Sequence, residues 1–333
     1  MTTFATDDSL LSTAEAHASL GEWGQLRELV VGIAAERRSP ALTLLLAEAQ
    51  LRTGDLEAAY SALVPLVPLL ARHADSELYR RAVNMLGAAA FELGRMTEAE
   101  QRFEEALSLA NGGGDSVALG RATNNLGMIA HIRGQYDRAL AHYQLAVPAY
   151  QRIGFTAGLA ETHHNMALAM RELGQLDSAD KQERRAIEFA REAGNGRMLA
   201  IAHVGRAELA LRRGEPAVAQ AGARLGARQY ASIPDAIGEA DALRLMGAAC
   251  TALGETHAAS VSLERAVTLA RAHGSTLVEA ESHEELARLQ LALGHWRAAE
   301  DEVQEARRLY RQLGAAPAEE LLERWYASAR RPG

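Results

Sequence analysis

The chain has 333 residues, of which 48% are hydrophobic but only 5% aromatic, so small and aliphatic side chains must form its core. Such a composition favours closely packed helices over a sheet sandwich. The formal net charge of −8 gives the molecule no overall attraction to phosphate backbones, so nucleic acid is not expected as a partner.

Cys250 is the only cysteine, which excludes an intramolecular disulfide. The first residues lack the basic segment and apolar core of a secretory signal. No apolar run approaches the ~18 residues needed to cross a membrane, so no membrane partner is expected either. These features together predict a cytoplasmic protein.

Glycines recur at a fixed interval along most of the chain. From Gly54 to Gly294 they follow one another at steps of 40 residues, and an alanine stands five residues after each one. These turn glycines are Gly54, Gly94, Gly134, Gly174, Gly214, Gly254 and Gly294. A fixed period of this length predicts a stack of helix–turn–helix units, each of which buries its apolar face against its neighbours.

A second series of glycines, from Gly114 to Gly314, marks the ends of most units, because glycine is favoured just past a helix C-terminus. Polar residues beside these positions are expected to cap the next helix. The candidate caps are Ser39, which precedes Pro40, and Asp75, Asp115, Asn195, Asp235 and Ser275. The predicted repeats are 9–38, 41–73, 76–113, 116–153, 156–193, 196–233, 236–273 and 276–313, followed by a capping helix at 316–329.

The pattern resembles the tetratricopeptide repeat family, here in a 40-residue form. Residues 122–147 show it most fully, with Leu126-Gly127 in the first helix, Gly134 at the turn and Tyr136 two residues later. Similar units occur in kinesin light chains, cell-polarity adaptors and bacterial peptide-sensing regulators. The resemblance implies an all-α, right-handed superhelical solenoid of about eight repeats, forming a single domain over residues 1–333.

The same resemblance implies that the first helix of each repeat lines a concave groove. In the family, groove side chains stand thirteen, ten, six, three and two residues before the turn glycine. The partner-binding residues expected on this basis are Arg81, Asn84, Arg121, Asn124, Met128, His131, His164 and Arg171. A lysine clamp for carboxylates is excluded because Lys181 is the only lysine.

The charges of the expected lining differ between the two ends of the chain. Arginine and asparagine predominate in the N-terminal half, whereas Asp241, Glu281 and Glu284 belong to the C-terminal half. A partner segment that is acidic at one end and basic at the other would fit this gradient.

The sequence contains no catalytic motif, so we expect a non-enzymatic scaffold or adaptor that binds a peptide or helical segment of another protein, without a cofactor. An alternative is a regulatory sensor whose groove binds a small signalling peptide and passes a conformational change to an effector. Compaction on ligand addition, measured by small-angle scattering, would favour the sensor. Self-association through the edges of the array is also left open.

Three further features have simple interpretations. His163, His203 and His283 share one position in the first helices of three repeats. They are expected to pack there and not to bind a metal, because one histidine per repeat does not form a compact ligand set. Cys250 stands in a column of small residues and is expected in the core. The segment 205–234 matches the repeat pattern least well and is a candidate flexible joint.

Overall fold

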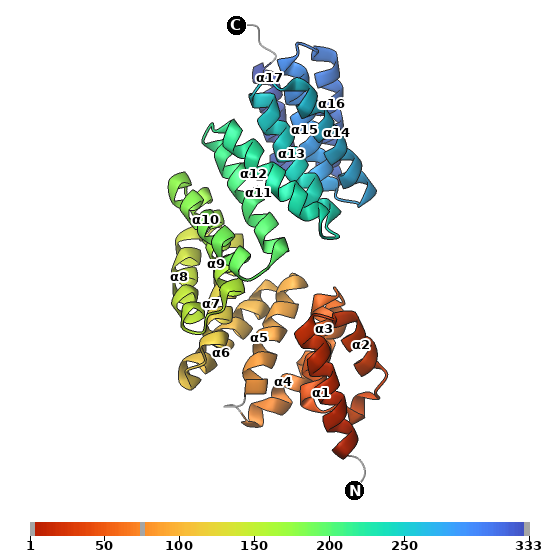
Figure 1. Ribbon diagram of the computed structural model, residues 1–333, viewed down its shortest axis with the longest axis vertical. Coiled ribbons are helices and arrows are strands. Elements are labelled where there is room, and N and C mark those ends of the chain that lie inside the picture. Colours follow the sequence, from red (N-terminus) through yellow and green to blue (C-terminus); the bar gives the residue numbers. More distant parts are fainter. Residues whose placement is uncertain (1–3, 74–76, 330–333) are drawn as a thin grey trace. The chain divides into compact units, whose positions relative to one another are not determined.

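The computed structural model describes residues 4–73 and 77–329. Within these ranges the chain is all-α: seventeen α-helices and two short 3-10 helices follow one another, with no strand. The chain divides into two compact units, Met1–Gly158 and Leu159–Gly333 (Figure 1). Each unit is described below by itself.

The first unit contains the helices α1 (Phe4–Leu20), α2 (Trp23–Val31), α3 (Pro40–Arg52), α4 (Leu56–Leu70), α5 (Glu77–Glu92), α6 (Met96–Gly113), α7 (Ser116–Ile132) and α8 (Tyr136–Arg152), with the 3-10 helices η1 (Ala35–Arg37) and η2 (Ala71–His73). Helix α9 (Thr156–Glu172) begins at the boundary between the units. The second unit continues with α10 (Leu176–Glu192), α11 (Gly196–Arg212), α12 (Pro216–Ala231), α13 (Ala236–Ala252), α14 (Thr256–Ala272), α15 (Thr276–Ala292), α16 (Trp296–Gln312) and α17 (Ala316–Ala329). Consecutive helices pack in pairs, so the predicted helix-pair architecture is confirmed.

The glycines of the repeat pattern lie at the helix ends, as predicted. Gly134 separates α7 from α8 and has a φ of 71°, which is the left-handed region that glycine adopts without steric cost. The N–H of the next residue, Gln135, donates to the carbonyl of Ala130 at 2.9 Å and closes the end of α7. The other turn and closing glycines of the pattern also have positive φ.

Four of the predicted caps are present, the one at Ser275 is not, and Asp75 lies outside the described residues. The carboxylate of Asp115 accepts hydrogen bonds from the N–H groups of Val117 and Ala118, at 3.1 and 3.0 Å. Asn195 and Asp235 cap α11 and α13 in the same way. Ser39 caps α3 from an extended backbone with ψ 157°.

Ser275 makes no side-chain cap, so that prediction is wrong. Its ψ of 82° resembles the values at Asp115 and Asn195 rather than the extended value at Ser39. At this backbone geometry the longer Asp or Asn side chain reaches the exposed N–H groups, whereas the shorter serine hydroxyl does not.

Small residues allow the two helices of a repeat to approach closely. A Cβ atom added at Gly127 of α7 would lie 2.4 Å from Cε1 of Tyr143 on α8, so the tyrosine ring fills the space that the glycine leaves. Tyr143 is 1% exposed, and the neighbouring alanines of the same face, Ala139 and Ala146, are fully buried. The alanine five residues after the turn glycine therefore lies on the packed face of the second helix.

The least regular repeat is packed as closely as the others. Helix α12 is continuous through Gly222 and Gly226. A Cβ atom at Gly226 would lie 2.7 Å from Cγ2 of Val204, and one at Gly222 would lie 3.2 Å from the carbonyl oxygen of His203. These glycines therefore serve close packing against α11, and a joint at 205–234 stays a prediction.

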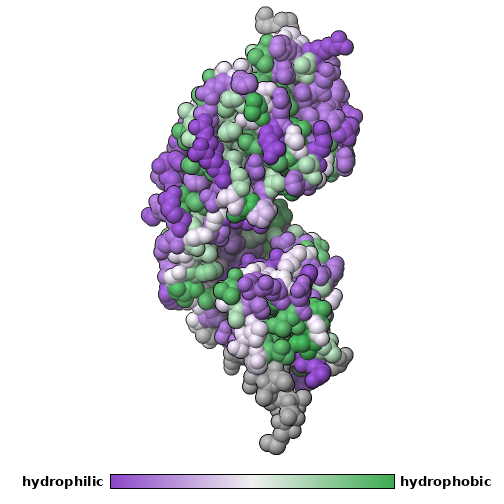
Figure 2. Space-filling view, turned by 45° about the vertical axis from the view of Figure 1, so that its right-hand side comes forward, coloured by the Kyte–Doolittle hydropathy of each residue, from purple (hydrophilic) through white to green (hydrophobic). Residues whose placement is uncertain are grey.

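The remaining packing features agree with the sequence. Cys250 is 2% exposed in the core, as expected, and burial raises the pKa of its thiol. Hydrophilic side chains cover much of the visible surface of each unit, and smaller hydrophobic areas are scattered among these side chains (Figure 2). Among the described residues, no helix is both long and apolar enough to cross a bilayer.

Candidate functional site

Three of the predicted binding residues line one pocket of the first unit. Arg81 and Asn84 on α5 and Arg121 on α7 border a cavity of about 580 Å³, which Glu48 of α3 also lines. All three helices are the first helices of their repeats, as the resemblance implied. The complete lining is Glu48, Glu77, Arg80, Arg81, Asn84, Asp115, Val117, Ala118 and Arg121.

Two of the three arginines in this pocket are held by carboxylates from the neighbouring repeats. Nη2 of Arg81 lies 3.2 Å from Oε2 of Glu48, and Nε of Arg80 donates to Oδ2 of Asp115 at 3.0 Å. Both guanidinium groups are therefore fixed in position and partly neutralised.

Asp115 has two roles at once in this pocket. Burial alone would raise the pKa of its carboxyl group, but the N–H of Ala118 and the Arg80 guanidinium outweigh that effect and lower the pKa. The carboxylate thus stays ionised while it caps α7 and binds Arg80. This double contact ties the first turn of α7 to α5.

Arg121 and Glu77 provide the pocket's two remaining charges. Both side chains are exposed, and neither has a hydrogen bond or ion pair within the described part of the chain. The pocket therefore offers one guanidinium and one carboxylate that are available to a ligand, beside the two internal ion pairs.

The predicted asparagines are placed differently from one another. Asn84 is half-buried and lines the pocket, and its Oδ1 accepts from Nδ2 of Asn125 at 3.5 Å. Asn124 is only 3% exposed, and its Nδ2 lies 3.9 Å from the sulfur of Met128. Asn124 therefore supports α7 internally in this conformation, whereas Asn84 borders the cavity.

Met128 and His131 continue along α7 away from the pocket lining. Met128 is half-buried beneath Asn124. The ring of His131 contacts the ring of Tyr136 edge to face, with the centroids 5.3 Å apart. His131 thus packs across the turn between α7 and α8.

His164 and Arg171 belong to a polar cluster in the second unit. Nδ1 of His164 lies 2.9 Å from Oε1 of Glu183, and Nη1 of Arg171 donates to Oε2 of Glu208 at 2.5 Å. Arg171 also contacts Glu172 through its Nε at 3.0 Å. Both predicted binding residues are therefore engaged with carboxylates of their own unit.

The acidic residues predicted to line the C-terminal half are likewise paired. Arg244 contacts Asp241 at 2.6 Å and Glu281 at 3.3 Å, and Arg288 contacts Glu284 at 2.5 Å. Burial alone would lower the pKa of Arg244, but Asp241 and Glu281 outweigh it and raise that pKa further above its ordinary value. These pairs reduce the negative charge that the sequence alone suggested for this half.

The sequence-based site omitted several residues of the pocket. Glu48 stands six residues before Gly54, the same offset that selected Met128 before Gly134, so the pattern contained a signal for it. Arg80 and Glu77 lie outside the family's groove positions and carried no such signal.

The histidines that share one repeat position make different contacts in different repeats. The ring of His163 stacks on Phe189 at 5.4 Å, and its Nδ1 lies 2.7 Å from Oε1 of Gln182. His283 is buried in another repeat and contacts Glu302.

These helix pairs define the class of protein: an all-α repeat protein, with a polar pocket lined by the first helices of its repeats. The family model described as tetratricopeptide repeat matches residues 79–152 and 118–192, which include most of α5 and all of α7. A model described as anaphase-promoting complex subunit 5 matches residues 282–327. No curated protein matches the chain.

Solved structures share the fold at low sequence identity. A Rap protein complexed with competence and sporulation factor is 11% identical, with a TM-score of 0.63 and 98% of each chain covered. The apo form of RapI is 14% identical, with a TM-score of 0.66, covering 83% of this chain and 99% of that one.

A signal transduction ATPase with numerous domains and a tetratricopeptide repeat sensor, from Pyrococcus horikoshii, is 14% identical, with a TM-score of 0.76. That match covers 97% of this chain, and the chain spans half the length of that protein. The chain therefore carries tetratricopeptide repeats over residues 79–192, and it shares its fold with these solved structures.

Proposed function

We propose that this protein is a non-enzymatic scaffold that binds a peptide or helical segment of another protein, and that the pocket between α3, α5 and α7 is its recognition site. The observation that carries the proposal is the exposed Arg121 guanidinium, which has no partner among the described residues and lies beside two arginines already fixed by carboxylates. A guanidinium in such a setting is available for bidentate binding of a ligand carboxylate.

The other pocket residues suggest how the segment would be held. The Asn84 amide can donate to a backbone carbonyl of the segment, and Val117 and Ala118 supply an apolar contact surface. Glu77 lies at the start of α5 and would favour a basic group or a backbone N–H. The preferred ligand therefore carries an acidic group for Arg121 and a donor group for Glu77.

Fold relatives support a protein or peptide ligand. The Rap protein was solved with competence and sporulation factor bound, and the archaeal ATPase carries its repeats as a sensor. These two relatives favour, as an alternative, a sensor whose groove binds a small signalling peptide and transmits a conformational change to an effector. The single buried, unpaired cysteine is consistent with the cytoplasmic setting that we propose.

Affinity measurements on one variant test the proposal. Peptides are selected from a random display library on the full chain, and their binding is measured by fluorescence anisotropy. Arg121→Ala removes a charge-assisted hydrogen bond and should weaken binding about 10–100-fold. Replacing the peptide's essential Asp or Glu by its amide should have little further effect on the variant, because the two changes remove the same contact.

Arg265→Ala provides the matched control. Arg265 lies on α14 of the second unit, is also exposed and has no ion pair within the described residues. The control variant should bind the selected peptides like the wild type. Equal affinity of the Arg121→Ala variant and the wild type for every selected peptide would refute the site.

A further inference from the structure

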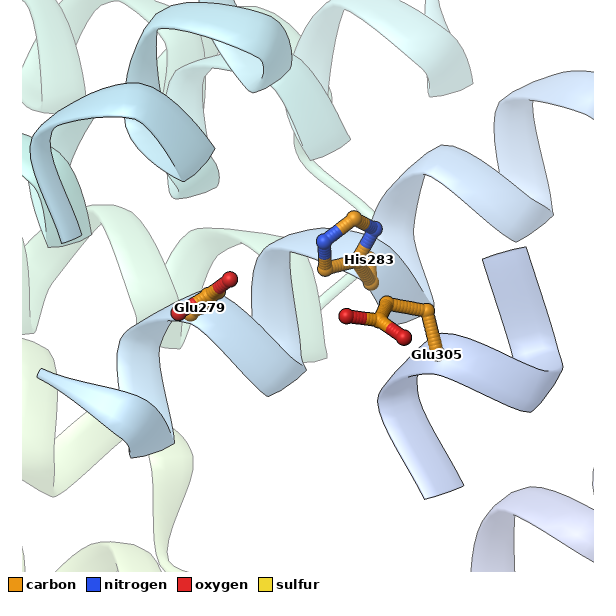
Figure 3. A group of neighbouring side chains, drawn as sticks. All are labelled: Glu279, His283 and Glu305. Carbon is orange, nitrogen blue, oxygen red and sulfur yellow. The ribbon is translucent and has the colours of Figure 1, made fainter. Parts of the chain in front are cut away.

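The last repeat brings three metal-ligating side chains together. Glu279 and His283 lie one turn apart on α15, and Glu305 lies opposite them on α16 (Figure 3). One ligand atom of each lies within 4.8 Å of those of the other two. Within the described part of the chain, this is the one group of histidine, cysteine or carboxylate side chains that is so arranged.

His283 has the orientation of a metal ligand. It is 8% exposed, and its Nδ1 lies 2.5 Å from Oε2 of Glu302. A carboxylate on Nδ1 holds the proton there and leaves the lone pair on Nε2. The same carboxylate–histidine contact commonly orients histidines that bind metal through the other ring nitrogen.

In this structure the guanidinium group of Arg271 lies among these ligand atoms. Nε of Arg271 donates to Oε1 of Glu279 at 2.7 Å, and Nη2 of the same arginine lies 3.4 Å from Nε2 of His283. Arg308 binds Glu305 at 2.7 and 2.9 Å. The Arg271 and Arg308 side chains are 59% and 57% exposed, so both can turn into solvent when another cation takes their place.

We propose that Glu279, His283 and Glu305 bind a divalent transition metal ion, with zinc as the best-fitting ion and Arg271 as the group it displaces. One imidazole and two carboxylates form a three-ligand zinc set with an open fourth position. Ligand atoms around tetrahedral zinc lie roughly 3.4 Å apart, so the side chains must move inward by about 1 Å. Bound zinc joins α15 to α16.

This site differs from the set of three histidines that share one position in the repeat pattern. The repeat pattern groups His283 with His163 and His203, which lie in other repeats. No metal site was predicted from that grouping. The structure groups His283 instead with carboxylates of its own repeat. The site lies in the second unit and does not depend on the proposed peptide pocket.

Calorimetric titration of the untagged full chain with zinc chloride tests the proposal. The wild type should bind one zinc ion, and magnesium chloride should give no binding heat because magnesium requires an oxygen cage. His283→Ala and Glu279→Gln should weaken zinc binding at least tenfold, and Glu302→Gln about 10–100-fold. Arg271→Ala should tighten binding, because zinc no longer has to displace the guanidinium.

Three further measurements make the result decisive. His257→Ala, which removes an exposed histidine on α14, should leave zinc affinity unchanged. Cobalt added to the wild type should give visible absorption bands that the His283→Ala protein lacks, and circular dichroism checks that each variant is folded. No zinc binding by the wild type, weaker binding by Arg271→Ala, or unchanged binding by folded His283→Ala would each overturn the proposal.

Discussion

Glu183 occupies a position that is apolar in most other repeats. Nine residues after each turn glycine, those repeats place Leu63, Phe103, Tyr143, Ala223, Leu263 and Val303, all of them buried. Glu183 is 1% exposed at this position, and its carboxylate contacts His164. Gly205 of α11 makes room for it, because a Cβ atom there would lie 2.4 Å from Oε1 of Glu183.

The buried pair should make stability depend on pH. Burial alone would lower the pKa of His164, but the Glu183 carboxylate outweighs burial, so the pKa of His164 is raised. Burial raises the pKa of Glu183 itself. Arg171 opposes the effect on His164, and Glu161 reinforces it. The stabilisation from His164 is thus complete below pH 6.5, its ordinary pKa, and is lost as the pH rises through the raised value.

Urea unfolding of the wild type and Glu183→Gln measures this dependence. The excess stability of the wild type over the variant should fall as the pH is raised from below 6.5 into the alkaline range. His163→Gln is the control, because burial lowers the pKa of His163 and its contribution is lost on acidification instead. A stability difference between wild type and Glu183→Gln that does not change with pH would contradict the assigned pair.

At the scale of helices, the close contacts between paired helices depend on residues without side chains. Gly127 on α7 accommodates Tyr143 of α8, and Gly247 on α13 accommodates Leu263 of α14 in the same way. Gly112 in α6 is different, because a Cβ atom there would have no neighbour within 4 Å. Adding a methyl group should therefore destabilise the protein at Gly127, where the space is filled, but not at Gly112, where it is open.

Gly127→Ala should destabilise the protein by about 1–3 kcal/mol, because the added methyl group collides with the Tyr143 ring in a filled core. Gly112→Ala should be neutral or stabilise by up to about 1 kcal/mol through better helix propensity. Denaturant unfolding of both variants provides the measurement. Destabilisation of equal size in the two variants would show that helix–helix spacing at Gly127 is not the cause.

At the scale of the whole molecule, the periodic features were predictable from the sequence. The 40-residue spacing of Gly54 to Gly294 predicted the helix ends. The alanines five residues after each of these glycines lie on packed helix faces. Both depend on local chemistry: a left-handed turn requires glycine, and close helix contact requires small side chains. The first-helix positions also selected Arg81, Asn84 and Arg121, which line one pocket.

Contacts between repeats were not predictable in the same way. The ion pair of Arg81 with Glu48 and that of Arg80 with Asp115 each join residues more than thirty positions apart. The Glu279–His283–Glu305 group likewise needs Glu305 from the facing helix. Such pairings depend on the rotation of one helix about its axis relative to the next, which a shared period does not specify.

Photocrosslinking at the pocket tests the central claim most directly. A benzophenone amino acid replaces Val117, which lines the pocket, or Leu145, which is 56% exposed on α8 of the same unit. Each protein is irradiated with a labelled peptide selected on the full chain. The account predicts a cross-link at position 117 that an excess of unlabelled peptide abolishes, and none at position 145. Cross-linking at 145 without any at 117 would contradict binding between α3, α5 and α7.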